Sequence, residues 1–293
     1  MPELTTVIIV AADSGASLRD CVQRARASRV PVEIIVVDNA SRDGVPQDVA
    51  HVHANDARVH VAYNDANLGF GPAVNIAARQ APGDTLLVLN PDCMLESDTV
   101  SRLLDVLRVY PDAGVIGAVV CDDNGDPDPA SRRRDPLLRR SLNEMTGRAK
   151  RDAGAAHEGV DVPGPIPERV VEVENISGAL MLIPRGVFDR LGGFDQGYFL
   201  HCEDLDLCRR ARDAGFKVLL AGNVRVLHAK GGSSAHRPVF VSYHKHRGMW
   251  RWFRKFDPAA RRPLLRALVA IGIAAHFTAT APLVAARRRN GHT

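Results

Sequence analysis

The stretch VEIIVVDNASRDG, residues 32–44, decides the fold because a β-branched run ends abruptly in acidic and amide side chains. A short apolar run bounded by turn residues predicts a strand buried on both faces. A similar run, TTVIIVAA at residues 5–12, precedes it, and the helical pattern of SLRDCVQRARAS lies between them. Strands that alternate with helices predict a parallel sheet with crossover helices, an α/β layer fold.

This alternation continues to residue 120 and then stops. Strand-like runs occur at 59–63, 85–90 and 113–120, and helical patterns at 71–81 and 97–110. Residues 121–170 are polar, charged and rich in Pro and Gly, which predicts an irregular, mobile insert. Further on we expect a strand at 175–184, a short helix at 185–193, an acidic helix from about Glu203 to Asp213 and strands within 217–229.

We therefore expect two parts in the chain. Residues 1–235 form the α/β domain, with a ligand-binding half at 1–120, the insert at 121–170 and a second half at 171–235. Residues 236–293 form a helical, basic extension.

The bulk composition indicates an ordinary globular protein of 293 residues with 45% hydrophobic residues and a formal charge of +4. Its five cysteines are scattered and form no C-x-x-C pair, which argues against a disulfide framework or a structural zinc site and favours a reducing cytoplasm. The apolar run near the N-terminus has no basic leader, so we interpret it as a strand and not as a signal peptide.

The C-terminal quarter combines basic, aromatic and apolar segments. HKHRGMWRWFRKF at residues 244–256 interleaves bases with aromatics, a pattern suited to lipid headgroups. Residues 267–286 are mostly apolar and nearly long enough to cross a bilayer, although His276 and Pro282 weaken that prediction. A spanning helix, a helix on the membrane surface and an ordinary packed helix all stay open.

Polar side chains follow the predicted strands at their carboxyl ends, where open α/β sheets bind ligands. Asp38 and Asn39 close one strand, and Asn90 and Asp92 close another. Each could also be simple turn chemistry, since Asp and Asn end strands for local hydrogen-bonding reasons. Their occurrence together on one edge favours a site.

Three further motifs carry polar groups. NLGFGPAVN, residues 67–75, places Gly69 and Gly71 before a helix, which leaves helix N–H groups free for a phosphate or sugar. It is neither a dinucleotide nor a Walker motif. HCEDLDLCRRAR, residues 201–212, begins a helix with acids and ends it with bases, which also suits the helix dipole. His228 follows a strand and, with Asp92, is a candidate ligand for Mg²⁺ or Mn²⁺.

Taken in order, VVDNASRDG, NLGFGPAVN, LNPD, SGALMLIPRGVFDRLGGFDQGYF, EDLDLCRR and VLH resemble the family 2 inverting glycosyltransferases of the GT-A fold, over roughly residues 5–235. Within the family, the pattern is most similar to bacterial, especially actinobacterial, rhamnosyltransferases that use dTDP-rhamnose and a decaprenyl-diphospho-GlcNAc acceptor. The resemblance implies a metal-dependent transfer in cell-wall arabinogalactan synthesis, at the cytoplasmic face of the plasma membrane.

The resemblance also implies a role for each matching residue. The nucleotide-sugar site comprises Asp13, Asp38, Asn39, Asn67, Gly69, Gly71 and Asn90. The metal ligands are Asp92 and His228, the general base is Asp204, and the acceptor contacts are Arg132, Glu203 and Arg247. An inverting transfer needs a base on one side of the anomeric carbon and a cation on the other, which explains two distant acidic motifs.

Two departures from the family pattern bear on the donor. The chain reads AADSG after its first strand, so Ala12 and Asp13 stand where the family often has an aromatic and Asn. Asn90 replaces the first Asp of the metal motif. Alternatives are therefore a UDP donor of galactofuranose or hexose, and a non-catalytic membrane-surface scaffold. A nucleotidyltransferase would carry a Gly-rich, Arg-containing loop directly after the first strand, and this chain matches that loop poorly. The acidic sheet edge argues against a nucleic-acid ligand. The sequence leaves a homo-oligomer open.

Overall fold

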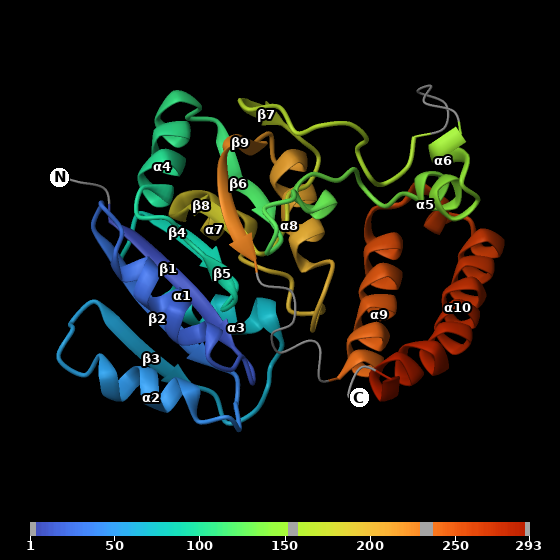
Figure 1. The fold of residues 1–293 in the computed structure, drawn as a ribbon. Helices are drawn as coiled ribbons and strands as arrows, with labels where there is room; N and C mark the ends of the chain where they lie inside the picture. Colours follow the sequence, from blue (N-terminus) through green and yellow to red (C-terminus); the bar gives the residue numbers. More distant parts are fainter. Residues whose placement is uncertain (1–3, 152–157, 229–236, 291–293) are drawn as a thin grey trace.

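The computed structural model describes residues 4–151, 158–228 and 237–290. Its centre is a mixed sheet in the order β3-β2-β1-β4-β8-β6-β9-β5, with β7 also paired to β9 (Figure 1). The strands are β1 Thr5–Ala11, β2 Val32–Asp38, β3 Val59–Tyr63, β4 Thr85–Leu89, β5 Cys93–Met94, β6 Ala113–Cys121, β7 Val170–Glu172, β8 Leu180–Pro184 and β9 Lys217–His228.

Helices cover both faces of the sheet, and a helical hairpin projects from one end of it (Figure 1). The helices are α1 Ser17–Arg26, α2 Val45–Val52, α3 Phe70–Gln80, α4 Thr99–Val109, α5 Leu138–Met145, α6 Arg148–Arg151, α7 Arg185–Leu191, α8 Glu203–Asp213, α9 Pro238–Phe256 and α10 Pro263–Asn290, with short 3-10 turns at Pro129–Ser131 and Pro258–Arg261. This architecture confirms the predicted α/β class with its C-terminal helical extension.

Two apolar cores lie on opposite faces of the sheet, because alternate residues of a strand point to opposite sides. Val7 and Ile9 pack into the core that contains residues of α1 and α4. Ile8 and Val10 pack into the other, with residues of α3, α7 and α8. This explains the unbroken apolar runs Val7–Ala11 in β1 and Ile34–Val37 in β2.

The strand directions set the position of the site. β1, β2, β3 and β4 are mutually parallel, whereas β8 runs antiparallel to both β4 and β6. β9 is parallel to β6, so the carboxyl end of β9 lies on the same edge as the carboxyl ends of β1, β2 and β4. The loop before β8 begins at this edge too, because β8 enters the sheet from there.

The insert differs from the sequence expectation, since its described part contains α5, α6 and a 3-10 turn. Charged groups hold it in place. Asp135 is 3% exposed and pairs with Arg209 and Arg212 of α8, at 3.0 and 2.6 Å. A search for apolar periodicity does not detect a segment that is fixed by buried ion pairs.

Helix α9 is anchored to the sheet-bearing part of the molecule. Trp252 is fully buried in a cluster with Tyr198 and Leu205. The Lys255 ammonium reaches both Asp195, at 2.8 Å, and Asp206 of α8, at 2.6 Å. These contacts tie the C-terminal hairpin to the helix that begins with Glu203 and Asp204.

Helix α10 packs along α9 and leaves its apolar surface open. Tyr243 of α9 meets Phe277 edge to face, and the imidazoles of His246 and His276 are 2.9 Å apart. The window Pro263–Leu283 is apolar and long enough to cross a membrane, and none of it is buried. This exposure favours the two membrane alternatives over an ordinary packed helix, although α10 does contact α9.

Candidate active site

The nucleotide-side residues of the sequence analysis lie in the loops after β1, β2 and β3. Asp38 is 3% exposed, and its carboxylate accepts the Ser41 N–H at 2.8 Å. Asp13 lies beside it in the β1 loop, in the left-handed region at φ 55°, and accepts the Arg42 N–H at 2.6 Å. The turn interpretation of Asp38 is thus correct locally, and the turn also brings Asp13 and Asp38 into one loop cluster.

Asn39 holds the glycine loop against the end of β2. Its amide donates to the Gly69 carbonyl at 3.0 Å and its oxygen accepts from Asn64 at 2.9 Å. Asn67 accepts the Gly69 N–H at 3.0 Å. Gly69 has φ +90° and a Cβ there would stand 2.5 Å from the Phe199 carbonyl oxygen, so this position requires glycine.

Gly71 lies in the first turn of α3 and allows the helix to approach Phe194. A Cβ on Gly71 would come 2.9 Å from the Phe194 Cβ. The two glycines therefore allow close packing of the loop and the helix. The sequence analysis had explained them only by the binding of a ligand.

Asp92, His228 and Asn90 form a second group at the same edge. The Asp92 carboxylate is 3.0 Å from His228 Nε2, and the Asn90 amide is 3.3 Å from the same nitrogen. β5 pairs with β9 at Cys93 and His228, which fixes this approach. Within the described residues, no group of three or more His, Cys, Asp or Glu side chains is arranged so that it could hold a metal ion by itself.

A carboxylate and an imidazole fit a divalent cation that takes its other ligands from water and substrate phosphates. Mg²⁺ usually binds proteins through only one or two carboxylates plus phosphates. Asp92 and His228 are nearly in contact and partly buried, with 14% and 21% of their side chains exposed. This donor set suits a metal shared with a diphosphate.

Asp204 lies in the first turn of α8 and is held by three donors. Its Oδ2 accepts from the Arg133 guanidinium at 3.0 Å and from the Gly178 N–H at 3.2 Å. Its Oδ1 accepts from the Leu205 N–H at 2.8 Å. These contacts fix the carboxylate at the carboxyl edge of the sheet.

A short hydrogen-bonded path joins the two acidic groups. The Asn90 N–H donates to the Ala179 carbonyl at 2.9 Å, and the preceding residue, Gly178, donates its N–H to Asp204. Asn90 also contacts His228. The start of β8 therefore lies between the Asp92–His228 pair and Asp204, at the same edge of the sheet.

Glu203 and His201 surround Asp204 with buried polar atoms. Burial and the adjacent Asp204 raise the pKa of Glu203 to about 8. Burial lowers the pKa of His201. Glu203 Oε2 and His201 Nε2 are both buried without a hydrogen-bond partner among the described residues. His201 and Cys202 adopt left-handed backbone conformations, with φ 68° and 69°, a strained arrangement that is common at functional sites.

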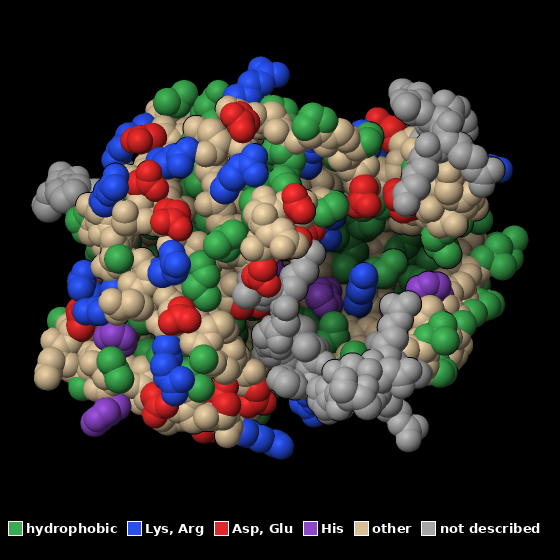
Figure 2. All heavy atoms as spheres, in the orientation of Figure 1, with side chains coloured by type: hydrophobic (Ala, Val, Ile, Leu, Met, Phe, Trp, Pro, Cys, Tyr) green, Lys and Arg blue, Asp and Glu red, His purple; other side chains and the backbone are tan. Residues whose placement is uncertain are grey.

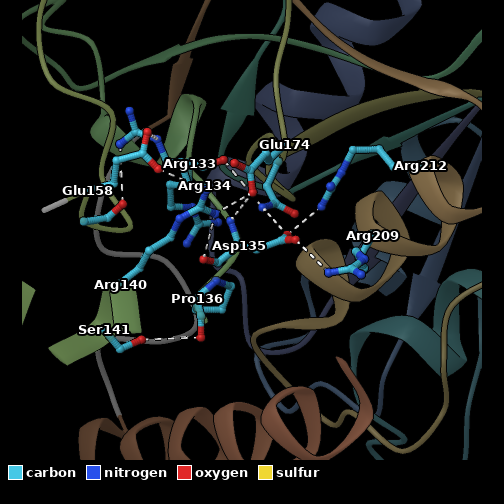
Figure 3. Close-up of polar contacts among 12 residues, drawn as sticks. Arg133, Arg134, Asp135, Pro136, Arg140, Ser141, Glu158, Glu174, Arg209 and Arg212 are labelled. Carbon is cyan, nitrogen blue, oxygen red and sulfur yellow. Dashed lines mark hydrogen bonds and ion pairs between the residues drawn. The ribbon is translucent and has the colours of Figure 1, made fainter. Parts of the chain in front are cut away.

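The insert meets α8 through a network of charges (Figure 3). Asp135 points between Arg209 and Arg212, and Glu174 and Glu158 flank Arg140. The Arg132 guanidinium is 2.8 Å from the Gly164 carbonyl and also contacts the carbonyls of Pro163 and Pro165. Arg247 is exposed on α9. Burial lowers the pKa of His244, and the Arg247 charge lowers it further.

Sequence reasoning missed Arg133 and Gly178, the side chain and the backbone group that contact Asp204. The SRRRDP run offers three adjacent arginines, and an extended backbone points alternate side chains in opposite directions. Arg132 has extended backbone angles, φ −144° and ψ 126°, so Arg132 and Arg133 diverge. A strict two-residue alternation from buried Asp135 would have selected Arg133.

A family model, Glycosyl transferase family 2, matches residues 6–162. The chain belongs to this family. It is a glycosyltransferase, and the resemblance seen in its ordered motifs is confirmed.

Two curated proteins similar to this family 2 glycosyltransferase are rhamnosyltransferases. It is 29% identical over 278 residues to the N-acetylglucosaminyl-diphospho-decaprenol L-rhamnosyltransferase of Mycobacterium tuberculosis, a match that covers 86% of this chain and 88% of the relative. It is 27% identical over 233 residues to the rhamnosyltransferase WbbL of Escherichia coli, which covers 76% and 82%.

Solved structures show the same fold at low identity. The mannosyltransferase PcManGT of Pyrobaculum calidifontis, in complex with GDP-Man and Mn²⁺, matches with a TM-score of 0.59 and 20% identity, over 100% of this chain and 80% of that one. GalNAc-T7 with UDP, GalNAc and Mn²⁺ matches with a TM-score of 0.60 and 17% identity, over 79% and 45%.

Proposed function

We propose that this glycosyltransferase inverts the anomeric centre and transfers L-rhamnose from dTDP-rhamnose to a polyprenyl-diphospho-GlcNAc acceptor. The carrying observation is the path from His228 and Asn90 through Ala179 and Gly178 to Asp204. It supports a single site with a metal-binding pair on one side and a carboxylate on the other. The identity with the mycobacterial relative supports the sugar and the acceptor.

We assign the nucleotide to the loops after β1, β2 and β3. Asp13 and Asp38 offer carboxylates to the base and ribose, and Asn39 and Asn67 shape the loop that carries Gly69. Gly71 and the first turn of α3 lie directly behind that loop. Residues 1–120 thus form the donor half, and 121–170 and 171–235 form the acceptor half.

The donor diphosphate lies beside Asp92, His228 and Asn90 in this proposal. Asp92 and His228 would hold Mg²⁺ or Mn²⁺ there. When bound, the cation neutralises the charge that develops on the departing nucleotide diphosphate.

Asp204 performs the proton transfer. The acceptor hydroxyl gives its proton to the carboxylate as the hydroxyl oxygen attacks the anomeric carbon, and the bond from that carbon to the diphosphate oxygen breaks. The nucleoside diphosphate leaves with the electron pair of the broken bond, so electrons and charge balance. No carboxylate nucleophile is needed.

The acceptor approaches from the insert and α9. We assign Arg132, Glu203 and Arg247 to this side, where α8 and α9 are tied together by Lys255. We assign helix α10, in the extension at 236–293, to a contact with the cytoplasmic face of the membrane. The exposure of Leu264, Leu268 and Ile271, at 74%, 54% and 65%, supports a membrane contact.

Transfer is tested by incubating the purified full chain with dTDP-rhamnose, Mg²⁺ and a prenyl-diphospho-GlcNAc, with product detection by mass spectrometry. We expect a rhamnosylated lipid, and none from Asp204→Asn. If UDP-galactofuranose or a UDP-hexose gives product and dTDP-rhamnose gives none, the donor is the UDP-sugar and not dTDP-rhamnose. No product from any nucleotide sugar overturns the proposal.

A further inference from the structure

The Arg133 guanidinium and the Gly178 N–H together occupy Oδ2 of Asp204, the proposed general base. A base accepts a proton through a carboxylate lone pair, and Oδ1 also accepts from the Leu205 N–H. The described structure therefore holds Asp204 in a restrained state.

The backbone of Arg133 is fixed, so any change must come from its side chain. Its N–H and carbonyl both pair with Asn175, each at 3.0 Å, and Asp135 locks the segment onto α8. Figure 3 shows Asp135 between the arginines of α8, two residues beyond Arg133. The guanidinium, with 25% of the side chain exposed, can turn while the chain stays in place.

Around this pair, three buried side-chain nitrogens lack a hydrogen-bond partner among the described residues, as does the neighbouring Glu203 Oε2. Arg133 Nε, His201 Nε2 and His244 Nδ1 have no hydrogen-bond partner in the part of the chain that the structure describes. His244 is 9% exposed. Burial lowers the pKa of His201, Asp204 acts to raise it, and the charges of Lys245 and Arg133 lower it further. Buried polar atoms normally find partners, so this cluster is built for a ligand that accepts hydrogen bonds.

The surface next to the cluster is hollowed. Figure 2 shows a depression over α9, between the body of the molecule and α10, with hydrophobic side chains inside it and Lys or Arg and His side chains beside it. An anionic group on an apolar chain matches this combination of cations and hydrophobic lining.

We propose that Arg133 is a positioning residue that guards Asp204, and that the acceptor's phosphate oxyanion, bound by Arg133, His201 and Lys245, draws the guanidinium away and frees the base. This rests on the proposed function. The guard keeps Asp204 from activating water before the acceptor arrives, which limits hydrolysis of the donor.

Anion binding is tested without catalysis. Calorimetric titration of the full chain with inorganic pyrophosphate in EDTA excludes the metal-dependent donor site, and farnesyl diphosphate and dTDP provide the comparisons. We expect Arg133→Gln to weaken pyrophosphate about tenfold or more, since charge-assisted hydrogen bonds are strong. We expect Arg108→Gln, an exposed arginine on α4, to bind like the wild type.

Farnesyl diphosphate distinguishes the source of the anion. If the wild type binds farnesyl diphosphate more tightly than pyrophosphate, and Arg133→Gln loses this difference, a lipid-linked acceptor is supported. Equal pyrophosphate binding by Arg133→Gln and wild type overturns the proposal, and so does an Arg133-dependent affinity shown by dTDP alone. These results do not depend on sugar transfer, so they stand apart from a failure of the proposed function.

The guard role has its own readout. We expect Arg133→Gln to raise the acceptor KM and to increase, several-fold, the hydrolysis of dTDP-rhamnose in the absence of acceptor. Structural damage would lower both transfer and hydrolysis. Arg133→Lys keeps the charge and tests folding, and matched circular dichroism melts of both variants check it. Unchanged or reduced hydrolysis in a folded Arg133→Gln overturns the guard.

Discussion

Asp204 and Glu203 are adjacent in sequence but sit in different electrostatic surroundings. Asp204 is held by a guanidinium and two backbone N–H groups. Glu203 has a buried oxygen with no partner among the described residues. Two neighbouring carboxyl groups with opposed environments are a common basis for dividing acid and base roles.

Asp204→Asn should lower sugar transfer by about 10²–10⁴-fold, because an amide cannot accept the acceptor's proton. Initial rates at saturating donor measure the loss. Asp213→Asn, on the same helix and 51% exposed, is the matched control and should keep near wild-type rates. Equal rates for both variants would remove Asp204 from the reaction.

Glu203 should make stability fall with rising pH. Its folded pKa, about 8, lies above the ordinary value of 4.5, so the native state binds more protons between these two pH values and loses stability as pH rises through them. Glu203→Gln stays neutral and should gain stability over the wild type between pH 5 and pH 8.5, by a few kcal/mol. Urea unfolding at both pH values measures the difference; a constant difference would contradict the prediction.

Individual site residues were predictable where a strand ends and hard to choose elsewhere. Asp38, Asn90, Asp92 and His228 follow strands, and strand direction alone brings them to one edge. Arg133 could not be chosen from three adjacent arginines, because its role depends on the pairing of its backbone with Asn175, 42 residues away.

Helix α8 connects the site with the insert. Its first turn carries Asp204, and its later turns carry the arginines that hold Asp135. The position of the Arg133 side chain relative to Asp204 therefore depends on an ion pair farther along α8.

Asp135→Asn should destabilise the fold by about 3–5 kcal/mol, since it leaves two arginines beside a buried neutral group. It should also reduce transfer by displacing Arg133. Chemical unfolding measures the first effect. Asp213→Asn breaks an exposed contact of the same Arg209 and should cost only about 0–1 kcal/mol; equal losses would show that Asp135 contributes no more than a surface pair.

Gly69→Ala should cost more than Gly125→Ala, although both glycines have similar positive φ, +90° and +84°. A methyl group at 69 meets the Phe199 carbonyl, whereas nothing lies within 4 Å at 125. The variant at 125 measures backbone strain alone, about 1 kcal/mol. Thermal melts and donor affinity distinguish the two; identical melts would mean that the loop yields without cost.

At the level of elements, the strands and helices up to β6 follow from their apolar periods. The antiparallel entry of β8 does not, because an apolar run of five residues carries no direction. The helices of the insert were missed since charge pairs, and not apolar faces, hold the segment to α8.

At the scale of the whole molecule, the surface is charged over the sheet-bearing body and apolar along α10. The body carries the site at its sheet edge, and α10 exposes leucine and isoleucine side chains with no cover in the described structure. Sequence composition predicted this contrast but left the geometry of the hairpin undetermined.

Leu268→Asp with Ile271→Asp should abolish co-sedimentation of the full chain with anionic vesicles, because both side chains are exposed on α10 and charges oppose insertion. Val109→Asp, an equally exposed apolar residue on α4, is the control. Vesicle binding that survives the double change would exclude α10 as the contact.

The bridge from Lys255 to Asp195 and Asp206 has a mechanical consequence. It ties α9 to α8, and α10 packs along α9. If α10 rests on lipid, as proposed, this connection holds the Asp204 carboxylate at a set height above the headgroups. The proposed function then favours an acceptor sugar close to the lipid anchor over one farther along a growing glycan.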